Sequence, residues 1–217
     1  MTEATATPPA EIQMFWSSRS PYCRKVMIVA HELAIVDRLR IERVVVGSAI
    51  PNARVMGYNP LNKIPTIVVP DGRVYFDSPV IAELFDMWYG QSTLFPRDVM
   101  ERQRAIRWQA LGDGFMDLLI QLLAESTRPV ELRSSKHLES YNLKIATVID
   151  GLQAEAAELA AVGFGIGHIS IGCALGHLDF RFGHIAWKED HPQLAAWYAD
   201  FLRRPSAQAT EYQDRYI

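Results

Sequence analysis

The sequence predicts an α/β N-terminal domain followed by an all-α C-terminal domain. In residues 11–89, short β-rich runs alternate with helical patterns, whereas from residue 99 onward apolar residues recur at helical spacing. Residues 90–98 contain Gly, Ser, Thr and Pro and break both patterns, so we expect a linker there. We therefore expect a flexible tail over residues 1–10, the α/β domain over 11–89 and the helical domain over 99–217.

The composition is typical of a globular protein. Hydrophobic residues make up 49% of the 217 residues, enough for a sizeable core. The 22 Lys and Arg are spread along the chain and are outnumbered by 25 Asp and Glu, which disfavours nucleic acid as a partner. The first residues lack the features of a secretory signal, and two cysteines are too few for a disulfide scaffold, so we expect a cytoplasmic protein.

We expect neither a membrane span nor a metal site. Residues 159–178 carry no charge if their histidines are neutral, but five glycines together with His168 and His177 make this segment a poor lipid-facing helix. A closely packed core helix explains the segment better. The six histidines have no zinc-ligand spacing.

The first unit has the pattern strand, helix, strand. Residues 12–16 are a short apolar run, and Ser20 and Pro21 then open a helix, because serine caps a helix N-terminus and proline at the first position loses no hydrogen bond. Residues 39–46 predict a second, parallel strand. The helix has an apolar face of Cys23, Val26, Met27, Ala30 and Ala34, with Arg24, Lys25 and Glu32 off that face.

A hairpin and a second helix complete the α/β domain, after a short helix or loop over residues 52–57. The β-rich runs 59–69 and 73–76 flank an Asp-Gly pair, which is a good signal for an antiparallel hairpin. Pro65 stands at the entrance to the first strand, where its peptide bond could be cis. Ser78 and Pro79 then open the second helix as Ser20 and Pro21 open the first.

Two serine-capped helix N-termini in one small domain are potential anion sites, since each presents backbone N–H groups and the positive end of the helix dipole. A ligand with two suitable ends could span them. At the first helix, the hydroxyls of Ser17, Ser18 and Ser20 could hold an anion or a thiolate. The alternative is that Ser20 only caps the helix, which is the common use of serine there.

The C-terminal domain is predicted to contain four long helices. They cover residues 99–127, 138–161, 164–182 and 192–203 and are separated by proline or glycine.

At this point the chain resembles the cytosolic glutathione transferase family, from Ile12 to about Thr210. The motifs are SSRSPYCRKV after the first strand, NPLNKIPTIV before the hairpin, DSPVIAELF at the second Ser-Pro helix and, more weakly, FLRRPSAQAT near the end. The resemblance implies a thioredoxin-like N-terminal domain, an all-helical C-terminal domain, a homodimer and a bacterial-type serine-class enzyme. One departure is that Gly165 and His168 replace the capping pair that most of the family has at the sixth helix.

The resemblance also implies the glutathione-binding residues. Pro65 would be the cis-proline, the backbone of Ile64 would pair with the cysteinyl part, and Lys63 would meet the glycyl carboxylate. Asp77 and Ser78 match the acidic residue and the serine that hold the γ-glutamyl end.

Ser20 is the favoured thiol-activating residue, and Ser18 is the alternative, because some serine-type members place the active hydroxyl earlier. We favour Ser20 because the helix dipole is strongest within the first turn. A hydroxyl donor and a helix N-terminus both lower the pKa of a bound thiol, so more thiolate forms to attack a small electrophile. Cys23 suggests dithiol chemistry, but Ser20 replaces the attacking cysteine of a CPYC motif, which favours a core role for Cys23.

The family builds its electrophile pocket on the long fourth helix, where Trp108, Leu111 and Phe115 lie near one face. Ordinary helix packing explains these three residues equally well. The predicted function is a glutathione transferase that acts in detoxification, with glutathione and a small electrophile as substrates and no metal. The same site also fits a glutathione-dependent isomerase, dehalogenase or peroxidase, or a non-catalytic binding module.

Overall fold

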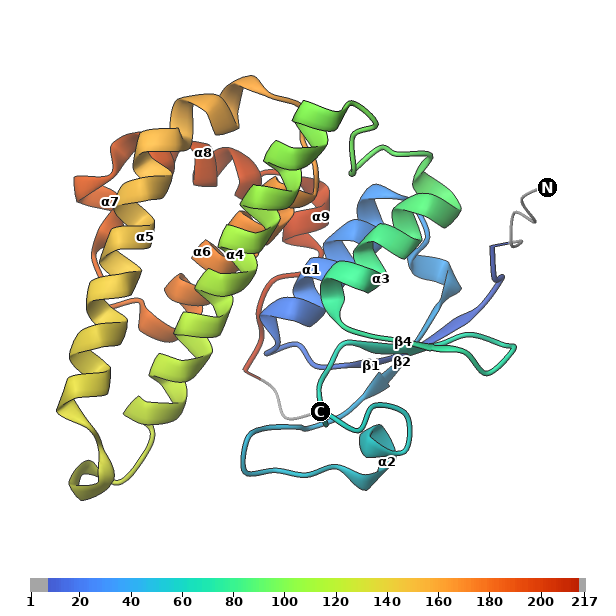
Figure 1. Ribbon diagram of the computed structural model, residues 1–217, viewed down its shortest axis with the longest axis horizontal. Helices are drawn as coiled ribbons and strands as arrows, with labels where there is room; N and C mark the ends of the chain where they lie inside the picture. The colour runs from blue at the N-terminus through green and yellow to red at the C-terminus, as the bar shows by residue number, and fades with distance from the viewer. Residues whose placement is uncertain (1–7, 215–217) are drawn as a thin grey trace.

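The computed structural model describes residues 8–214, which form two packed halves (Figure 1). The first seven residues of the predicted tail 1–10 lie outside this range. The α/β half holds a four-stranded sheet in the order β2-β1-β3-β4. β1 (Ile12–Trp16) pairs in parallel with β2 (Leu39–Arg43), whereas β3 (Thr66–Val68) is antiparallel to β1 and to β4 (Val74–Tyr75). The predicted parallel strand and the hairpin are therefore confirmed.

Helices cover both faces of this sheet. α1 (Pro21–Glu32) and α3 (Ser78–Phe85) lie on the face turned toward the helical half, and the short α2 (Ala53–Met56) lies on the other face (Figure 1). A 3-10 turn, η1 (Val36–Arg38), precedes β2, and a π-helical turn, η2 (Asp86–Gly90), follows α3. The α/β half is thus a three-layer unit with α1 at the boundary between the two halves.

The second half is helical throughout, so the predicted fold class is confirmed. Its long helices lie within a few residues of the predicted ranges, and short helical turns fill the connections. No helix within residues 8–214 is long and apolar enough to cross a lipid bilayer. The elements in order are α4 (Val99–Ser126), η3 (Val130–Leu132), α5 (Ser135–Ala161), α6 (Ile166–Phe182), α7 (Trp187–Asp190), α8 (Pro192–Leu202) and α9 (Pro205–Gln208).

The close crossing of α4 and α6 forms the centre of the helical half. It depends on Gly112, where an added Cβ would lie 2.5 Å from the carbonyl carbon of Ser170 and 2.7 Å from the backbone nitrogen of Ile171. Such distances are far below van der Waals contact, so a side chain here would push the two helices apart. The predicted closely packed core helix is confirmed, since nearly all of α6 is buried.

The sequence prediction placed Arg24 and Lys25 off the apolar face of α1, and the face that carries them is nevertheless covered. Both are buried: Arg24 is 5% exposed and Lys25 is 0% exposed. The reason is that α6, α9 and α4 of the helical half cover the side of α1 that faces away from the sheet. Lys25 is paired with Asp113 on α4, and the Arg24 guanidinium lies 4.5 Å above the Tyr212 ring.

The start of α6 also corrects the sequence prediction, which treated the capping pair as missing. The His168 side chain supplies half of such a cap, because its Nδ1 accepts a hydrogen bond of 3.1 Å from the backbone N–H of Gly165. The other ring nitrogen lies 3.1 Å from the carbonyl oxygen of Leu159. A neutral imidazole satisfies both groups, and burial accordingly lowers the pKa of His168.

A second polar link joins the two halves at the C-terminal end of α1. The Glu32 carboxylate accepts hydrogen bonds from Arg204 Nε at 3.0 Å and Nη2 at 2.8 Å, and from the Ser206 hydroxyl. Both donors stand where α8 ends and α9 begins. The end of α1 is therefore attached to the helical half as well as to its own sheet.

Candidate active site

A cavity of about 1290 Å³ lies between the two halves of the molecule. Its α/β wall consists of the β1–α1 turn, the loop after β2, the entrance to β3 and the N-terminus of α3. Its other wall consists of one face of α4 and the last turns of α6. Ser18, Ser20, Lys63, Ile64, Pro65, Asp77 and Ser78 all line this cavity, so the structure brings these predicted residues together.

Ser20 is the N-cap of α1. Its Oγ accepts a hydrogen bond of 3.2 Å from the backbone N–H of Cys23, and the buried Cys23 thiol also interacts with this hydroxyl. A hydroxyl has one donor and two acceptor positions, so capping leaves the O–H of Ser20 available. Ser18 differs, because its hydroxyl donates a hydrogen bond of 2.9 Å to the carbonyl oxygen of Gln213.

The turn before β3 presents free backbone groups to the cavity. The peptide bond between Ile64 and Pro65 is cis. Buried side chains hold the turn from behind, with Asn59 Nδ2 at 3.2 Å and Thr66 Oγ1 at 2.8 Å from the carbonyl oxygen of Lys63. The N–H and C=O of Ile64 take part in no hydrogen bond within residues 8–214, and the Lys63 side chain is exposed.

At the start of α3 the N-cap position belongs to Asp77, and its carboxylate caps no backbone N–H of the helix. The prediction of a second serine cap is therefore wrong, because Ser78 is already the first helical residue. Ser78 is 1% exposed, and its Oγ has no hydrogen-bond partner among the described residues. A buried hydroxyl without a partner is costly, and at a cavity wall it is placed to bind a polar ligand.

Tyr22 of α1 and two aspartates of α4 also line the cavity. Tyr22 donates a hydrogen bond to Asp117, and burial together with that carboxylate raises the pKa of the phenol above its ordinary value. Asp113 accepts two hydrogen bonds of 2.8 Å from the buried ammonium of Lys25, and burial raises the pKa of Asp113. The Tyr22 proton is thus held by Asp117 and is not offered to the cavity.

The cysteines do not contribute a reactive thiolate. Cys23 and Cys173 are both 0% exposed, and burial raises the pKa of each thiol to about 12. A protonated, buried thiol is a poor nucleophile. The prediction that both cysteines belong to the core is confirmed.

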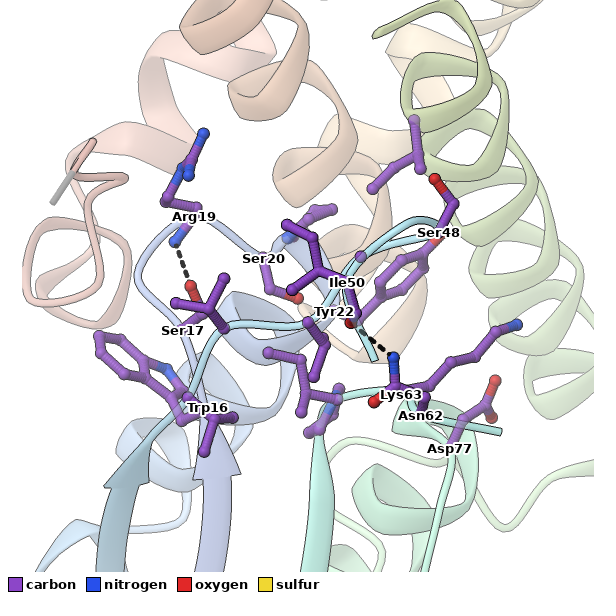
Figure 2. Close-up of a pocket in the computed structure, with 18 of the residues that line it drawn as sticks. Trp16, Ser17, Arg19, Ser20, Tyr22, Ser48, Ile50, Asn62, Lys63 and Asp77 are labelled. Atoms are coloured by element: carbon purple, nitrogen blue, oxygen red, sulfur yellow. Dashed lines mark hydrogen bonds between the residues drawn. The ribbon is translucent and has the colours of Figure 1, made fainter. Parts of the chain in front are cut away.

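The labelled residues in Figure 2 show how the cavity is arranged. In this view Ser20 lies between Arg19 on one side and Lys63 and Asp77 on the other, and the Arg19 side chain extends away from that pair. Tyr22 comes from the same helix start as Ser20. The cavity therefore has two polar ends, with the capping serine between them.

Comparison with known proteins agrees with this layout. Residues 19–87 match the family model for the glutathione S-transferase N-terminal domain, and residues 138–200 match that for the C-terminal domain. The uncharacterised GST-like protein YibF of Escherichia coli is 30% identical over 204 residues, which cover 92% of this chain and 98% of YibF. The chain belongs to the glutathione S-transferase family.

Solved structures of glutathione S-transferase family members are similar over nearly the whole chain. One from Pseudomonas fluorescens Pf-5, with bound glutathione, is 38% identical with a TM-score of 0.90 and covers 94% of this chain and 100% of its own. Another, from Methylobacillus flagellatus, also with glutathione bound, is 32% identical with a TM-score of 0.84 and the same coverages. The predicted thioredoxin-like fold of the α/β half is confirmed by this family membership.

The residues predicted for the electrophile pocket lie elsewhere in this glutathione S-transferase family member. Trp108, Leu111 and Phe115 do not line the cavity; Trp108 and Phe115 are each 1% exposed. They lie on the side of α4 that packs against α6, because Gly112 on the same side marks the crossing point. The face of α4 that lines the cavity instead carries Asp113, Asp117, Ile120, Leu123, Ala124 and Thr127.

Sequence reasoning also missed three cationic or imidazole side chains in the cavity wall: Arg19, His177 and Arg181. A signal was present, since His177 and Arg181 are four residues apart and so share one face of an otherwise apolar helix. The Lys25–Asp113 pair has no local signal, because its two members are 88 residues apart in the sequence.

Proposed function

We propose that this protein is a glutathione transferase of the bacterial serine type that activates the thiol of glutathione with the Ser20 hydroxyl. The observation that carries the proposal is the position of the Ser20 hydroxyl, which lines the cavity at the N-terminus of α1 and whose O–H the cap does not use. Ser18 is the weaker candidate, because its proton is already donated to Gln213. A donor and a helix dipole that converge on one sulfur favour its charged form.

Glutathione would bind along the α/β wall of the cavity. The free N–H and C=O of Ile64 suit the backbone of the cysteinyl residue, since an extended peptide pairs with unpaired backbone groups. The Ser78 hydroxyl and the N-terminus of α3 suit the γ-glutamyl carboxylate, Asp77 suits its ammonium, and Lys63 suits the glycyl carboxylate. The bound glutathione of the Pseudomonas fluorescens relative supports glutathione as the ligand.

The proposed reaction is nucleophilic attack by the glutathione thiolate on a small electrophile. The thiol proton leaves to solvent, a carbon–sulfur bond forms, and the leaving group departs with its bonding electron pair. Ser20 contributes by donating a hydrogen bond to the sulfur anion, which lowers the thiol pKa from its ordinary value near 8.5. Each pKa unit corresponds to about 1.4 kcal/mol, within the range of one charge-assisted hydrogen bond.

The test is a pH titration of the complex. Glutathione binding is measured by calorimetry, and the thiolate by its ultraviolet absorbance, in the wild type and in Ser20→Ala and Ser18→Ala. We expect Ser20→Ala to raise the bound thiol pKa by about one unit and to lower turnover, with little change in affinity. Ser18→Ala serves as the matched control and should keep the thiol pKa. An unchanged pKa in Ser20→Ala would contradict the role of Ser20, and no glutathione binding would contradict the function.

The wider assignments follow from the same proposal. We propose a glutathione-binding domain over residues 11–89, a linker over 90–98 and a helical domain over 99–217. We also propose a homodimer that works in the cytoplasm in detoxification. Size-exclusion chromatography with light scattering tests the homodimer directly.

A further inference from the structure

At the end of the cavity away from Lys63 and Asp77, an aspartate of the chain forms ion pairs with two arginines of the cavity wall. Oδ1 of Asp214 lies 2.9 Å from Arg19 Nε and 3.3 Å from Arg181 Nη1. Arg19 belongs to the β1–α1 turn and Arg181 to the last turn of α6, and both line the cavity. Two guanidinium groups from opposite walls therefore converge on one carboxylate oxygen.

The three side chains differ in exposure. Arg19 and Arg181 are 26% and 12% exposed, whereas Asp214 is 58% exposed. A largely exposed carboxylate gains little from an ion pair, because water competes for both partners. The two arginines are more buried than Asp214, so leaving them without an anion would cost more free energy than leaving Asp214 without a cation. Asp214 is thus suited to be exchanged for another carboxylate.

His177 adds a third polar group to the same place. It lies one turn before Arg181 on α6, lines the cavity and is 1% exposed. Neither of its ring nitrogens has a hydrogen-bond partner among the described residues. Burial, with Arg181 and Arg24 nearby, lowers its pKa to about 3, so the ring is neutral at physiological pH and keeps one N–H donor. A carboxylate oxygen in this part of the cavity would give that donor an acceptor.

The position of these groups suits the electrophile. Gln213, the neighbour of Asp214, is bonded to both the hydroxyl and the carbonyl oxygen of Ser18, so the arginines lie beside the turn that holds Ser20. Lys63 and Asp77, two of the groups assigned to glutathione, lie on the other side of Ser20 in the view of Figure 2. A molecule attacked by the thiolate would therefore extend from Ser20 toward Arg19.

We propose that Arg19, Arg181 and His177 form a subsite for a carboxylate on the electrophile, which takes the place of Asp214. The substrate class is then small electrophiles that carry a carboxylate. This inference rests on the proposed function, because it takes the glutathione sulfur to lie at Ser20.

Two matched conjugates test the subsite by binding alone. Calorimetry compares S-(2-carboxyethyl)glutathione with its uncharged isostere S-(2-carbamoylethyl)glutathione, and with glutathione itself. We expect the wild type to bind the carboxylate about tenfold more tightly than the amide, which corresponds to about 1.4 kcal/mol. Arg181→Gln and Arg19→Gln should each remove most of this preference. Arg203→Gln removes the same charge from an exposed position that does not line the cavity, and it should keep the preference.

Removing the charge of Asp214 should change the affinity for the carboxylate conjugate in the opposite direction from removing an arginine. Asp214→Asn should tighten binding of the carboxylate conjugate by about two- to threefold, because a competing anion is removed, and should leave the amide unchanged. Equal binding of the two conjugates to the wild type, or a preference that survives both arginine variants, would overturn the subsite while glutathione binding still stands. Failure of glutathione itself to bind would overturn the proposed function, and the subsite with it.

Discussion

Replacing Asp113 by asparagine should destabilise the protein by about 3–5 kcal/mol, because it leaves the ammonium of Lys25 buried without a counter-charge. Lys25 Nζ lies 2.8 Å from both carboxylate oxygens, and the Lys25 side chain is 0% exposed. No other carboxylate within residues 8–214 forms an ion pair with Lys25. At 2.8 Å and an effective dielectric constant of about 20, the Coulomb attraction is roughly 6 kcal/mol.

Most of that attraction is offset by the loss of hydration, as the directions of the pKa shifts indicate. Burial lowers the pKa of Lys25 and raises that of Asp113, so in each group desolvation outweighs the partner. The intact pair should therefore contribute little net stability, while either partner alone is costly. Consequently, the double variant Lys25→Met with Asp113→Leu should be nearly as stable as the wild type.

The assay is a double-mutant cycle by urea unfolding at pH 7, followed by tryptophan fluorescence. With a slope of about 2–3 kcal/mol per molar urea, each single variant should shift the midpoint by about 1–2 M. The cycle of Lys25→Met, Asp113→Leu and their combination should give a coupling free energy of about 6–10 kcal/mol, because the two single costs of about 3–5 kcal/mol are absent from the double variant. Single variants that each cost less than about 1 kcal/mol, or a double variant that costs the sum of the two, would refute this account of the pair.

Two further predictions concern the helical half. Gly112→Ala should destabilise the protein by about 1–3 kcal/mol, because the new Cβ would meet the backbone of α6. Gly114→Ala lies in the same helix, with no atom within 4 Å of the new Cβ, and should stabilise the protein by about 0.5–1 kcal/mol. Thermal unfolding of both variants is the test, and a loss of stability in both would contradict a specific close contact of α4 and α6 at Gly112. His191 Nε2 lies 2.8 Å from Asp150 Oδ1, and this hydrogen bond raises the pKa of His191 above the ordinary 6.5. The contribution of the His191–Asp150 pair to the free energy of unfolding is therefore complete below pH 6.5 and is lost as the pH rises through the folded-state pKa. His191→Gln should therefore cost more unfolding free energy at pH 5.5 than at pH 8.5, by up to about 1 kcal/mol, and a cost independent of pH would count against the ion pair.

The elements of the fold could be predicted because their signals are local. The Ser-Pro helix starts, the Asp-Gly hairpin and the helical spacing after residue 98 are each set by a few neighbouring residues. The residues around Ser20, Ile64 and Ser78 could be placed in one cavity because three short motifs resemble those with which the glutathione transferase family binds glutathione.

What sequence could not show is which face of a helix meets a distant helix. The helical pattern places Lys25 off the apolar face of α1 but cannot show what covers it, because its partner Asp113 lies 88 residues further on. The apolar spacing of Trp108 and Phe115 is compatible with either a pocket or helix packing. The close contact of α4 with α6 at Gly112 places both side chains in the interface between these helices. The capping role of His168 could not be predicted for another reason. The family pattern has a carboxylate at this position, and an imidazole can accept the same hydrogen bond.

The attachment of α1 to both halves has a consequence for how this protein can change over evolutionary time. The N-terminus of α1 carries Ser20, while its remaining turns are fixed by Lys25 to α4, by Arg24 to the α9 turn and by Glu32 to Arg204. A substitution in the helical wall of the cavity should therefore also shift α1, and with it the Ser20 hydroxyl. Lineages in which that wall changes should show correlated changes in α1, rather than independent drift of the two halves.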